Sequence, residues 1–211
     1  MKKSVVICCA GTGTRLGKNI PKCLVEFNGK KVIDYELELF RDFDEIILVV
    51  GYKAEMVIDY VNGLNFTNIK FVVNDKVSTT TSGDSFYLGS LHAKNDMIVA
   101  SCGDIIINPF DFKQVIDCNE EFVCARDISS QQPVLLSEKN GMAISIGIGD
   151  GSLEWLGLAG IKKEHIEDLH GYIYDVFKKI LPIRVIKVSA QEIDTLNDYK
   201  STFEWLDRGM K

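Results

Sequence analysis

The chain has 211 residues, of which 46% are hydrophobic and 26% charged, as is ordinary for a globular protein. Its net charge of −6 argues against a nucleic-acid-binding protein, which needs a basic face, but leaves room for a nucleotide held by a few cations and backbone amides. No stretch reaches the roughly 20 apolar residues of a membrane span. The six cysteines are irregularly spaced, which indicates free thiols in a reducing compartment, so we expect a cytoplasmic protein. With no C-x-x-C pair and only three histidines, we expect no zinc site.

The first half of the chain alternates between buried strands and helices. Ser4–Cys9 is a continuous apolar run, as expected of a buried parallel strand. Because the connections between elements are short, the pattern predicts a mostly parallel sheet covered by helices on both faces. The other elements expected here are helices at 31–41, 54–61 and 83–92 and strands at 45–50, 69–73 and 96–101.

The second half is less regular and is punctuated by glycines. We find no internal repeat and no long linker, so we expect one domain over residues 1–211. The elements expected are short strands at 122–125, 134–136, 143–146 and 153–158, a helix at 163–179 interrupted at Gly171, a strand at 183–188 and a closing helix at 195–208.

A glycine-rich loop, GTGTRLG at residues 11–17, follows the first strand. A dinucleotide-binding G-x-G-x-x-G motif fails because Leu16 stands where the third glycine belongs. A P-loop fails twice, at Thr12 and Asn19. The signature G-x-G-T-R-x-G…P-K fits throughout, with Pro21 and Lys22 completing it.

The spacing of the two cations in this signature suits a triphosphate. Arg15 can hold β- and γ-phosphates with its two-pronged guanidinium, and Lys22 supplies a point charge near the α-phosphate. Pro21 fixes φ just ahead of Lys22. We therefore predict that Arg15 and Lys22 are catalytic residues.

Four blocks spread over residues 8 to 199 carry a family resemblance: CCAGTGTRLGKNIPKCLVEFNGKKVIDYELELF, IILVVGYKAEMV, CGDIIINPF and EIDTLNDY. They resemble small bacterial nucleotidyltransferases, in particular CTP-dependent cytidylyltransferases that activate phosphocholine and related molecules. The resemblance implies a three-layer α/β/α sandwich with a mostly parallel, mixed central sheet of the Rossmann-like GT-A type. It also implies a nucleotide-binding half (1–110), an acceptor half (111–211), an NTP and a small phosphorylated substrate as partners, and a role in cell-surface polysaccharide biosynthesis. A homodimer is compatible with the sequence.

Two aspartates are the expected ligands of a magnesium ion. Asp104 follows the strand at 96–101, at the edge where ligands bind in open α/β sheets. Asp194 lies just before the closing helix, where it could instead serve as a cap; Thr195 can take that role and leave Asp194 free. In the resembled family an aspartate at each place coordinates Mg²⁺, which implies a metal site at Asp104 and Asp194.

Base recognition is expected from the polar segment after the third strand. The resembled cytidylyltransferases carry Asn-Asp-Lys followed by Asn- and Ser-rich residues, whereas this chain has Asn74-Asp75-Lys76 followed by three threonines at 79–81. The retained Asn-Asp-Lys favours CTP, and the threonines leave the choice of base open. Part of the segment is equally consistent with a polar loop and helix cap. The predicted nucleotide-binding residues are Ala10, Gly11, Thr12, Gly13, Thr14, Asn74, Thr81, Ser82, Gly83 and Ser85.

The acceptor pocket is expected at Glu154, Trp155 and Gly157, because the resembled family has a Glu, an aromatic residue and a glycine there. Trp155 beside carboxylates could cage a quaternary ammonium group, and it is equally plausible as ordinary core. A phosphorylated alcohol, a phosphonate or a sugar phosphate all stay open as acceptor. The alternatives to cytidylyl transfer are a sugar-1-phosphate uridylyl-, thymidylyl- or guanylyltransferase, a GT-A-fold glycosyltransferase and a non-catalytic nucleotide-binding module.

Overall fold

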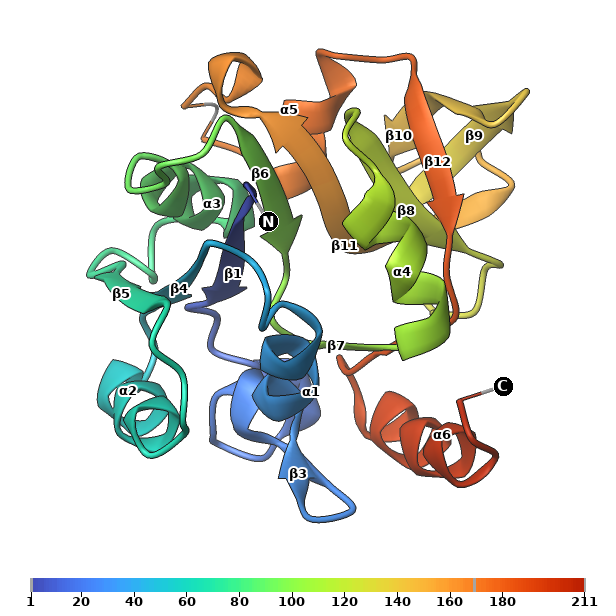
Figure 1. Ribbon diagram of the computed structural model, residues 1–211. Helices are drawn as coiled ribbons and strands as arrows, with labels where there is room; N and C mark the ends of the chain where they lie inside the picture. The colour runs from blue at the N-terminus through green and yellow to red at the C-terminus, as the bar shows by residue number, and fades with distance from the viewer. Residues whose placement is uncertain (1, 169, 211) are drawn as a thin grey trace.

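The computed structural model describes residues 2–168 and 170–210, and its centre is a nine-stranded sheet that runs from β5 to β9 (Figure 1). The strand order is β5-β4-β1-β6-β11-β8-β12-β10-β9. The first four of these strands are parallel, whereas β11 is antiparallel to both of its neighbours, β6 and β8. The strands are β1 (Ser4–Cys9), β4 (Glu45–Val50), β5 (Ile69–Val73), β6 (Met97–Ser101), β8 (Phe122–Arg126), β9 (Leu135–Lys139), β10 (Met142–Gly147), β11 (Leu153–Lys162) and β12 (Ile183–Lys187).

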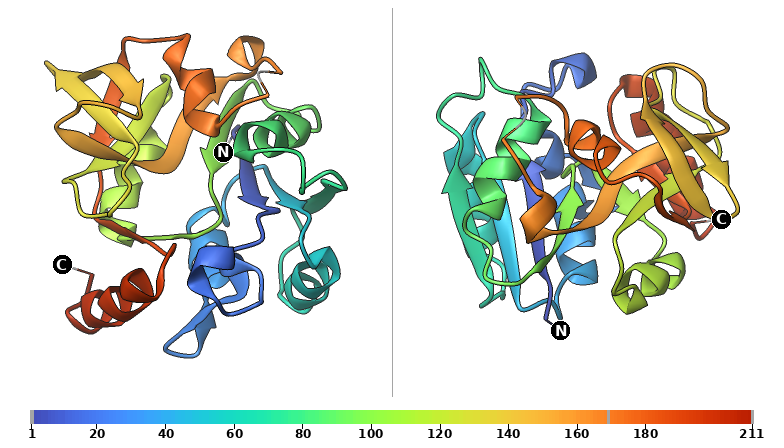
Figure 2. Two further views of the ribbon diagram at one scale, coloured as in Figure 1. Left: turned by 180° about the vertical axis from the view of Figure 1, so that it is seen from behind. Right: turned by 90° about the horizontal axis from the view of Figure 1, so that it is seen from above.

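Helices cover both faces of this sheet (Figure 2). Side chains alternate along β1, so Val5 and Ile7 enter one core while Val6 and Cys8 enter the other. The first core packs under α1 (Val32–Leu39), α2 (Ala54–Asn62) and α4 (Pro109–Asp117); the second packs under α3 (Ser82–Ser90) and α5 (Ile173–Lys178). The predicted α/β fold with a central mixed sheet is confirmed. Among the described residues no helix has the length and apolarity that crossing a membrane requires.

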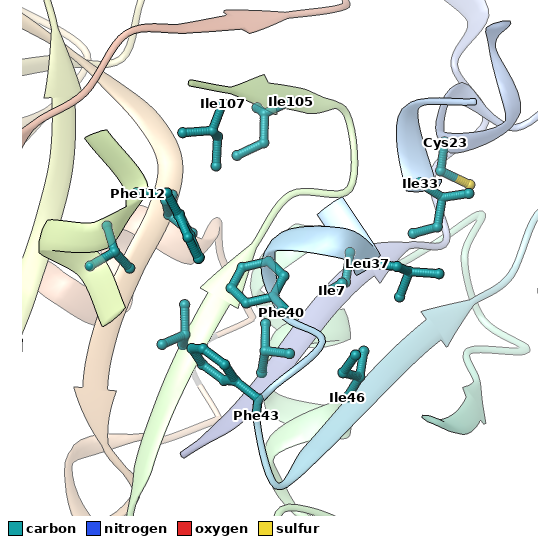
Figure 3. Packing of buried hydrophobic residues seen from close by; sticks show 14 of the residues in the cluster. Ile7, Cys23, Ile33, Leu37, Phe40, Phe43, Ile46, Ile105, Ile107 and Phe112 are labelled. Atoms are coloured by element: carbon teal, nitrogen blue, oxygen red, sulfur yellow. The ribbon is translucent and has the colours of Figure 1, made fainter. Parts of the chain in front are cut away.

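Aromatic rings join the two halves of the chain in the first core (Figure 3). Phe40, at the end of α1, lies with its ring centroid 5.1 Å from Phe43 and 5.1 Å from Phe112 of α4, both edge-to-face. Such pairs add roughly 0.5–1.5 kcal/mol beyond the area that they bury. The α4 helix is thereby fixed against the C-terminal end of α1.

A third, smaller core holds the loops that border the sheet. The hairpin of β2 (Glu26–Phe27) and β3 (Lys30–Lys31) packs with α6 (Leu196–Asp207), and the ring centroids of Phe27 and Tyr199 are 4.9 Å apart. Leu16 of the glycine-rich loop and Ile193 ahead of α6 are buried in the same cluster. This core therefore holds residues 11–17 and residues 192–195 beside each other.

The structure departs from the expected elements at several places. The helix expected at 163–179 with an interruption at Gly171 is confirmed only after the interruption, as α5. Before it, a single 3₁₀ turn, Lys163–His165, is followed by described residues that are not helical; Leu169 lies outside the described residues. The α4 helix was not predicted, although Asn108 caps it by accepting from the backbone N–H of Phe110 and Pro109 stands at its first position. Also unforeseen is the antiparallel pair of β7 (Ile105–Ile107) and β13 (Ala190–Glu192), which connects segments over 80 residues apart.

Candidate active site

The glycine-rich loop and Asp104 meet at the point where the strand order reverses. From β1 the chain builds β4 and β5 on one side, then returns to β6 on the other, and ligands bind in the crevice that such a reversal leaves at the carboxyl ends of the strands. A cavity of about 260 Å³, called the loop cavity below, lies there. Its walls are Cys8, Cys9, Gly11, Thr12, Gly13, Thr14, Arg15, Lys22, Cys23, Cys102, Gly103 and Asp104.

Positive φ angles let the loop turn tightly at the end of β1. Gly13 (φ +59°) and Gly17 (φ +68°) flank a single 3₁₀ turn in which the N–H of Leu16 donates to the carbonyl of Gly13 at 3.1 Å. A Cβ added at Gly13 would lie 2.9 Å from Cγ of Lys22. Gly13 is therefore required both for the turn and for the path of the Lys22 side chain across it.

Three carboxylates gather opposite these cations. Carboxylate oxygens of Asp104, Glu192 and Asp194 lie within 4.8 Å of one another. The pairing of β7 with β13 brings them together: Ile105 is opposite Glu192, and the N–H of Ile193 donates to the carbonyl of Asp104 at 2.9 Å. Sequence reasoning missed Glu192, although residues two apart on a strand share a face, so Glu-x-Asp was an available signal.

Lys22 and Arg15 neutralise these carboxylates in the structure. Lys22 Nζ lies 2.8 Å from Asp104 Oδ2 and also contacts Asp194 Oδ1, while Arg15 is 3.0 Å from Asp194 Oδ2. Burial by itself lowers the pKa of Lys22, but Asp104 and Asp194 raise it above its ordinary value. Burial, together with the charges of Asp104 and Asp194, raises the pKa of Glu192 to about 8. The cluster thus has three acidic groups, Asp104, Glu192 and Asp194, beside two cations.

The residues of this cluster fit a magnesium ion. Mg²⁺ prefers oxygen ligands, and all three side chains offer carboxylate oxygens. Asp104 Oδ1 is buried without a hydrogen-bond partner among the described residues, so it has an unused acceptor. Asp194 is free of the capping role, because the N-cap of α6 is Thr195, whose hydroxyl accepts from the N–H of Asp198.

A second cavity, of about 280 Å³, continues the loop cavity toward the start of α3 and is called the α3 cavity below. The helix begins after Thr81, whose N–H donates to Asp84 Oδ2 at 2.7 Å. Six of the predicted nucleotide-binding residues lie in the walls of this cavity, which are Cys8, Ala10, Gly11, Thr12, Val77, Thr80, Thr81, Ser82, Ser85 and Cys102.

Two other predicted nucleotide-binding residues have contacts inside the protein. Asn74 is buried and donates to Thr80 Oγ1 at 2.9 Å and to Ser85 Oγ at 3.0 Å, so it orders the cavity wall. Gly83 donates its N–H to the carbonyl of Gly171 at 2.9 Å, and a Cβ at Gly83 would lie 2.1 Å from that oxygen. Both residues therefore influence the shape of the α3 cavity through contacts inside the protein and do not line it.

A third and larger cavity, of about 740 Å³, opens on the acceptor side and is called the aromatic cavity below. The Trp155 and Tyr174 rings are edge-to-face with centroids 6.2 Å apart, and Tyr172 stacks on Tyr174 at 5.4 Å. Trp155 is thus both core and cavity wall, and its buried Nε1 has no partner among the described residues. The walls are Arg15, Ser82, Gln132, Pro133, Val134, Leu135, Ile148, Gly149, Trp155, Tyr172, Tyr174 and Glu192.

The other two predicted acceptor residues have evident internal roles. Glu154 is 1% exposed; its carboxylate contacts Arg126 at 3.2 Å and accepts from the backbone N–H of Ser129 at 2.8 Å. Gly157 (φ +68°) lies at the irregular point of β11, and a Cβ there would be 2.5 Å from Cys102 Sγ. Sequence reasoning also missed Tyr172 and Tyr174 as cavity residues; it placed both just after the interruption at Gly171, in the second part of the expected helix.

A family model described as a MobA-like NTP transferase domain matches residues 5–152. The CTP:phosphoglutamine cytidylyltransferase of Campylobacter jejuni is 33% identical over 135 residues, which span 60% of this chain and only about half (53%) of that protein. The choline-phosphate cytidylyltransferase of Streptococcus pneumoniae is 26% identical over 234 residues, covering 95% of this chain and 97% of that protein.

Solved structures agree on the fold. The CTP:phosphocholine cytidylyltransferase from Streptococcus pneumoniae superposes with a TM-score of 0.78 at 23% identity, covering 98% of this chain and all (100%) of the other. The inositol-1-phosphate CTP transferase from T. maritima gives 0.81 at 20% identity, with 99% and 96% covered. Because the family model spans more than half of its residues, the chain belongs to the MobA-like NTP transferase family of nucleotidyltransferases.

Proposed function

We propose that the protein transfers CMP from CTP to a small phosphorylated alcohol, phosphonate or sugar phosphate, with release of pyrophosphate and with Mg²⁺ as cofactor. One observation carries the proposal: the three cavities adjoin one another, and Ser82 is common to the walls of the α3 cavity and the aromatic cavity. The loop cavity shares Gly11 and Thr12 with the α3 cavity and Arg15 with the aromatic cavity. A triphosphate in the first would place its base in the second and face an acceptor in the third.

The chain's own residues suit an in-line displacement at phosphorus. An oxygen of the acceptor phosphate forms a bond to the α-phosphorus of CTP while the bond to the β-phosphate bridging oxygen breaks, and pyrophosphate leaves with the electron pair. Lys22 stabilises the charge that develops at the α-phosphate, and Arg15 with the amides of residues 11–14 holds the departing pyrophosphate. No general base is required, because the acceptor phosphate is already ionised.

Asp104 and Asp194 are the proposed metal ligands, with Glu192 as a third carboxylate of the same cluster. When bound, Mg²⁺ supplies positive charge to the phosphate oxygens of the nucleotide. The division into a nucleotide-binding half, 1–110, and an acceptor half, 111–211, is part of the proposal. It is supported by the aromatic cavity, most of whose walls come from residues after 110.

Two observations support CTP as the nucleotide and guide the choice of acceptor. Two relatives and two structural neighbours carry cytidylyltransferase or CTP transferase in their names. The rings of Trp155 and Tyr172 in the cavity wall favour an acceptor with an apolar or cationic group, since aromatic rings attract cations within about 6 Å of their centroids. Phosphocholine is therefore the first acceptor to test.

The test incubates purified protein and Mg²⁺ with each of CTP, UTP, dTTP, ATP and GTP against a panel of acceptors. The panel holds phosphocholine, glycerol 3-phosphate, a polyol phosphate, a phosphonate and glucose 1-phosphate, and pyrophosphate release is measured. We expect turnover with CTP and one or more of these five acceptors. Turnover only with UTP or dTTP and glucose 1-phosphate would show a sugar nucleotidyltransferase, and no release with any pair would refute the proposed reaction.

Two variants with a matched control test the roles of the carboxylates. Asp104→Asn and Asp194→Asn keep the size of the side chain and remove its charge, so each should lower turnover by at least ~10²-fold while the protein stays folded. Asp207→Asn, at the exposed last residue of α6, lies outside the carboxylate cluster and should keep most of the activity. Full turnover in either of the first two would remove that residue from the proposed site.

A further inference from the structure

A carboxyl group lies fully buried in α1, outside the three cavities. Glu36 is 0% exposed, and its Oε2 accepts from the hydroxyl of Ser101, the last residue of β6, at 2.5 Å. The backbone N–H of Ile105, the first residue of β7, also favours the charged carboxylate. Glu36 is therefore hydrogen-bonded to the residue just before the turn at 102–104, which carries Asp104.

The carboxyl group is costly at this position. Burial raises the pKa of Glu36 to about 8, although Ser101 and Ile105 counteract this rise, and Oε1 has no partner among the described residues. Its neighbours along the helix, Ile33 and Leu37, are fully buried in the first apolar core. Burying a carboxyl group costs free energy where its polar atoms lack hydrogen-bond partners, and an apolar side chain of similar size would avoid this cost. Packing alone therefore does not explain a carboxyl group here.

The turn that Glu36 contacts is held on its other sides as well. Gly103 has φ +73°, and a Cβ there would lie 2.8 Å from both the carbonyl oxygen of Cys8 and Sγ of Cys9. On the far side, the carbonyl of Asp104 accepts from the N–H of Ile193. The buried carboxyl of Glu36 adds a further support, through its hydrogen bond with Ser101 just ahead of the turn.

We propose that Glu36 is a positioning residue, which fixes the turn between Ser101 and Ile105 and thereby holds the Asp104 carboxylate in the orientation that binds a divalent cation. The inference rests on the proposed function in one respect, the role of Asp104 as a metal ligand. Groups that orient a metal ligand typically contribute 10–100-fold to metal affinity or activity.

The experiment compares Glu36→Leu, Glu36→Gln and Ser101→Ala with the unmodified protein. Mn²⁺ binding is measured by electron paramagnetic resonance without nucleotide, thermal unfolding is measured in EDTA, and kcat and the KM values are measured with the active substrates. We expect Glu36→Leu to unfold at the same or a higher temperature, to bind Mn²⁺ about 10-fold or more weakly, and to lose kcat with an unchanged KM for the acceptor. Glu36→Gln keeps the shape and an acceptor oxygen and should regain most of the Mn²⁺ affinity, while Ser101→Ala should show a smaller loss.

Glu36→Leu with the Mn²⁺ affinity and kcat of the unmodified protein would overturn the proposal, because the carboxyl would then only fill the core. If Glu36→Leu does not fold, Ser101→Ala decides in the same way: unchanged Mn²⁺ affinity overturns the proposal and weakened affinity supports it. Mn²⁺ binding is read without turnover. If the protein binds Mn²⁺ but releases no pyrophosphate with any substrate pair, the proposed reaction is refuted. The Mn²⁺ affinities of the variants still test the role of Glu36.

Discussion

Replacing Lys22 by methionine should change catalysis and metal binding in opposite directions. In the free protein the ammonium group of Lys22 contacts both Asp104 and Asp194, the carboxylates proposed to hold Mg²⁺. Methionine keeps most of the side-chain length and removes the charge. A divalent cation would then no longer compete with a tethered one for the same oxygens.

The geometry of the pair sets the size of the effect. Lys22 and Asp104 side chains are 17% and 13% exposed and 2.8 Å apart. At an effective dielectric constant near 20, unit charges 4 Å apart interact by about 4 kcal/mol. Desolvation of the lysine offsets part of this, and breaking a buried ion pair typically costs about 3–5 kcal/mol. We therefore expect Lys22→Met to lose about 3 kcal/mol of unfolding free energy in EDTA and to bind Mn²⁺ roughly 10-fold more tightly without nucleotide.

Turnover should fall at the same time, by about 10²–10³-fold, because a charge aimed at the reacting phosphate is lost. The assays are pyrophosphate release, Mn²⁺ titration by electron paramagnetic resonance, and urea unfolding with and without Mg²⁺. Lys18→Met is the matched control, since Lys18 Nζ lies over the Tyr199 ring, 3.7 Å from its centroid. A folded Lys22→Met protein whose Mn²⁺ affinity is unchanged or weaker would refute the idea that Lys22 and the metal compete.

Three further outcomes follow from single contacts. Gly13→Ala must adopt φ near +59° and brings a Cβ to 2.9 Å from Cγ of Lys22, so we expect a cost of about 1–2 kcal/mol in urea unfolding and at least about 10-fold slower pyrophosphate release. Glu154→Gln leaves Arg126, 11% exposed, without its counter-charge and should lower the unfolding free energy by about 3 kcal/mol, measured by urea titration. For Glu36 the folded pKa, about 8, exceeds the ordinary 4.5, so the folded state binds the extra proton and stability falls as pH rises between these values. In unfolding experiments at pH 5, 6 and 7, the unfolding free energy of Glu36→Gln should lack this fall, which is up to about 1.4 kcal/mol per pH unit. The same pH dependence in both proteins would contradict a buried carboxyl with a raised pKa.

Local pattern predicted much of the first half. The strands at Ser4–Cys9, Glu45–Val50 and Ile69–Val73 have the expected bounds, because each is a short run of β-favouring residues ended by a turn. The part of the helix expected at 163–179 that precedes Gly171 failed for the opposite reason: the apolar residues of the range fit a helical pattern, but only Ile173–Lys178 packs on the sheet as a helix. The residues ahead of it instead lie against α3, where Thr81 Oγ1 donates to the carbonyl of Gly171.

The sequence by itself determined the glycine-rich loop with Arg15 inside it and Lys22 shortly after it, because a turn of this kind depends on residues near each other in the chain. It also placed Asp104 and Asp194 each at the end of an element. Only the tertiary structure decided that Glu192 joins them, through the pairing of Ile105–Ile107 with Ala190–Glu192. It alone also placed Glu36 against Ser101, just ahead of the turn that carries Asp104. These contacts join residues 65 to over 80 positions apart, and packing between distant elements leaves little trace in the local pattern from which a sequence is read.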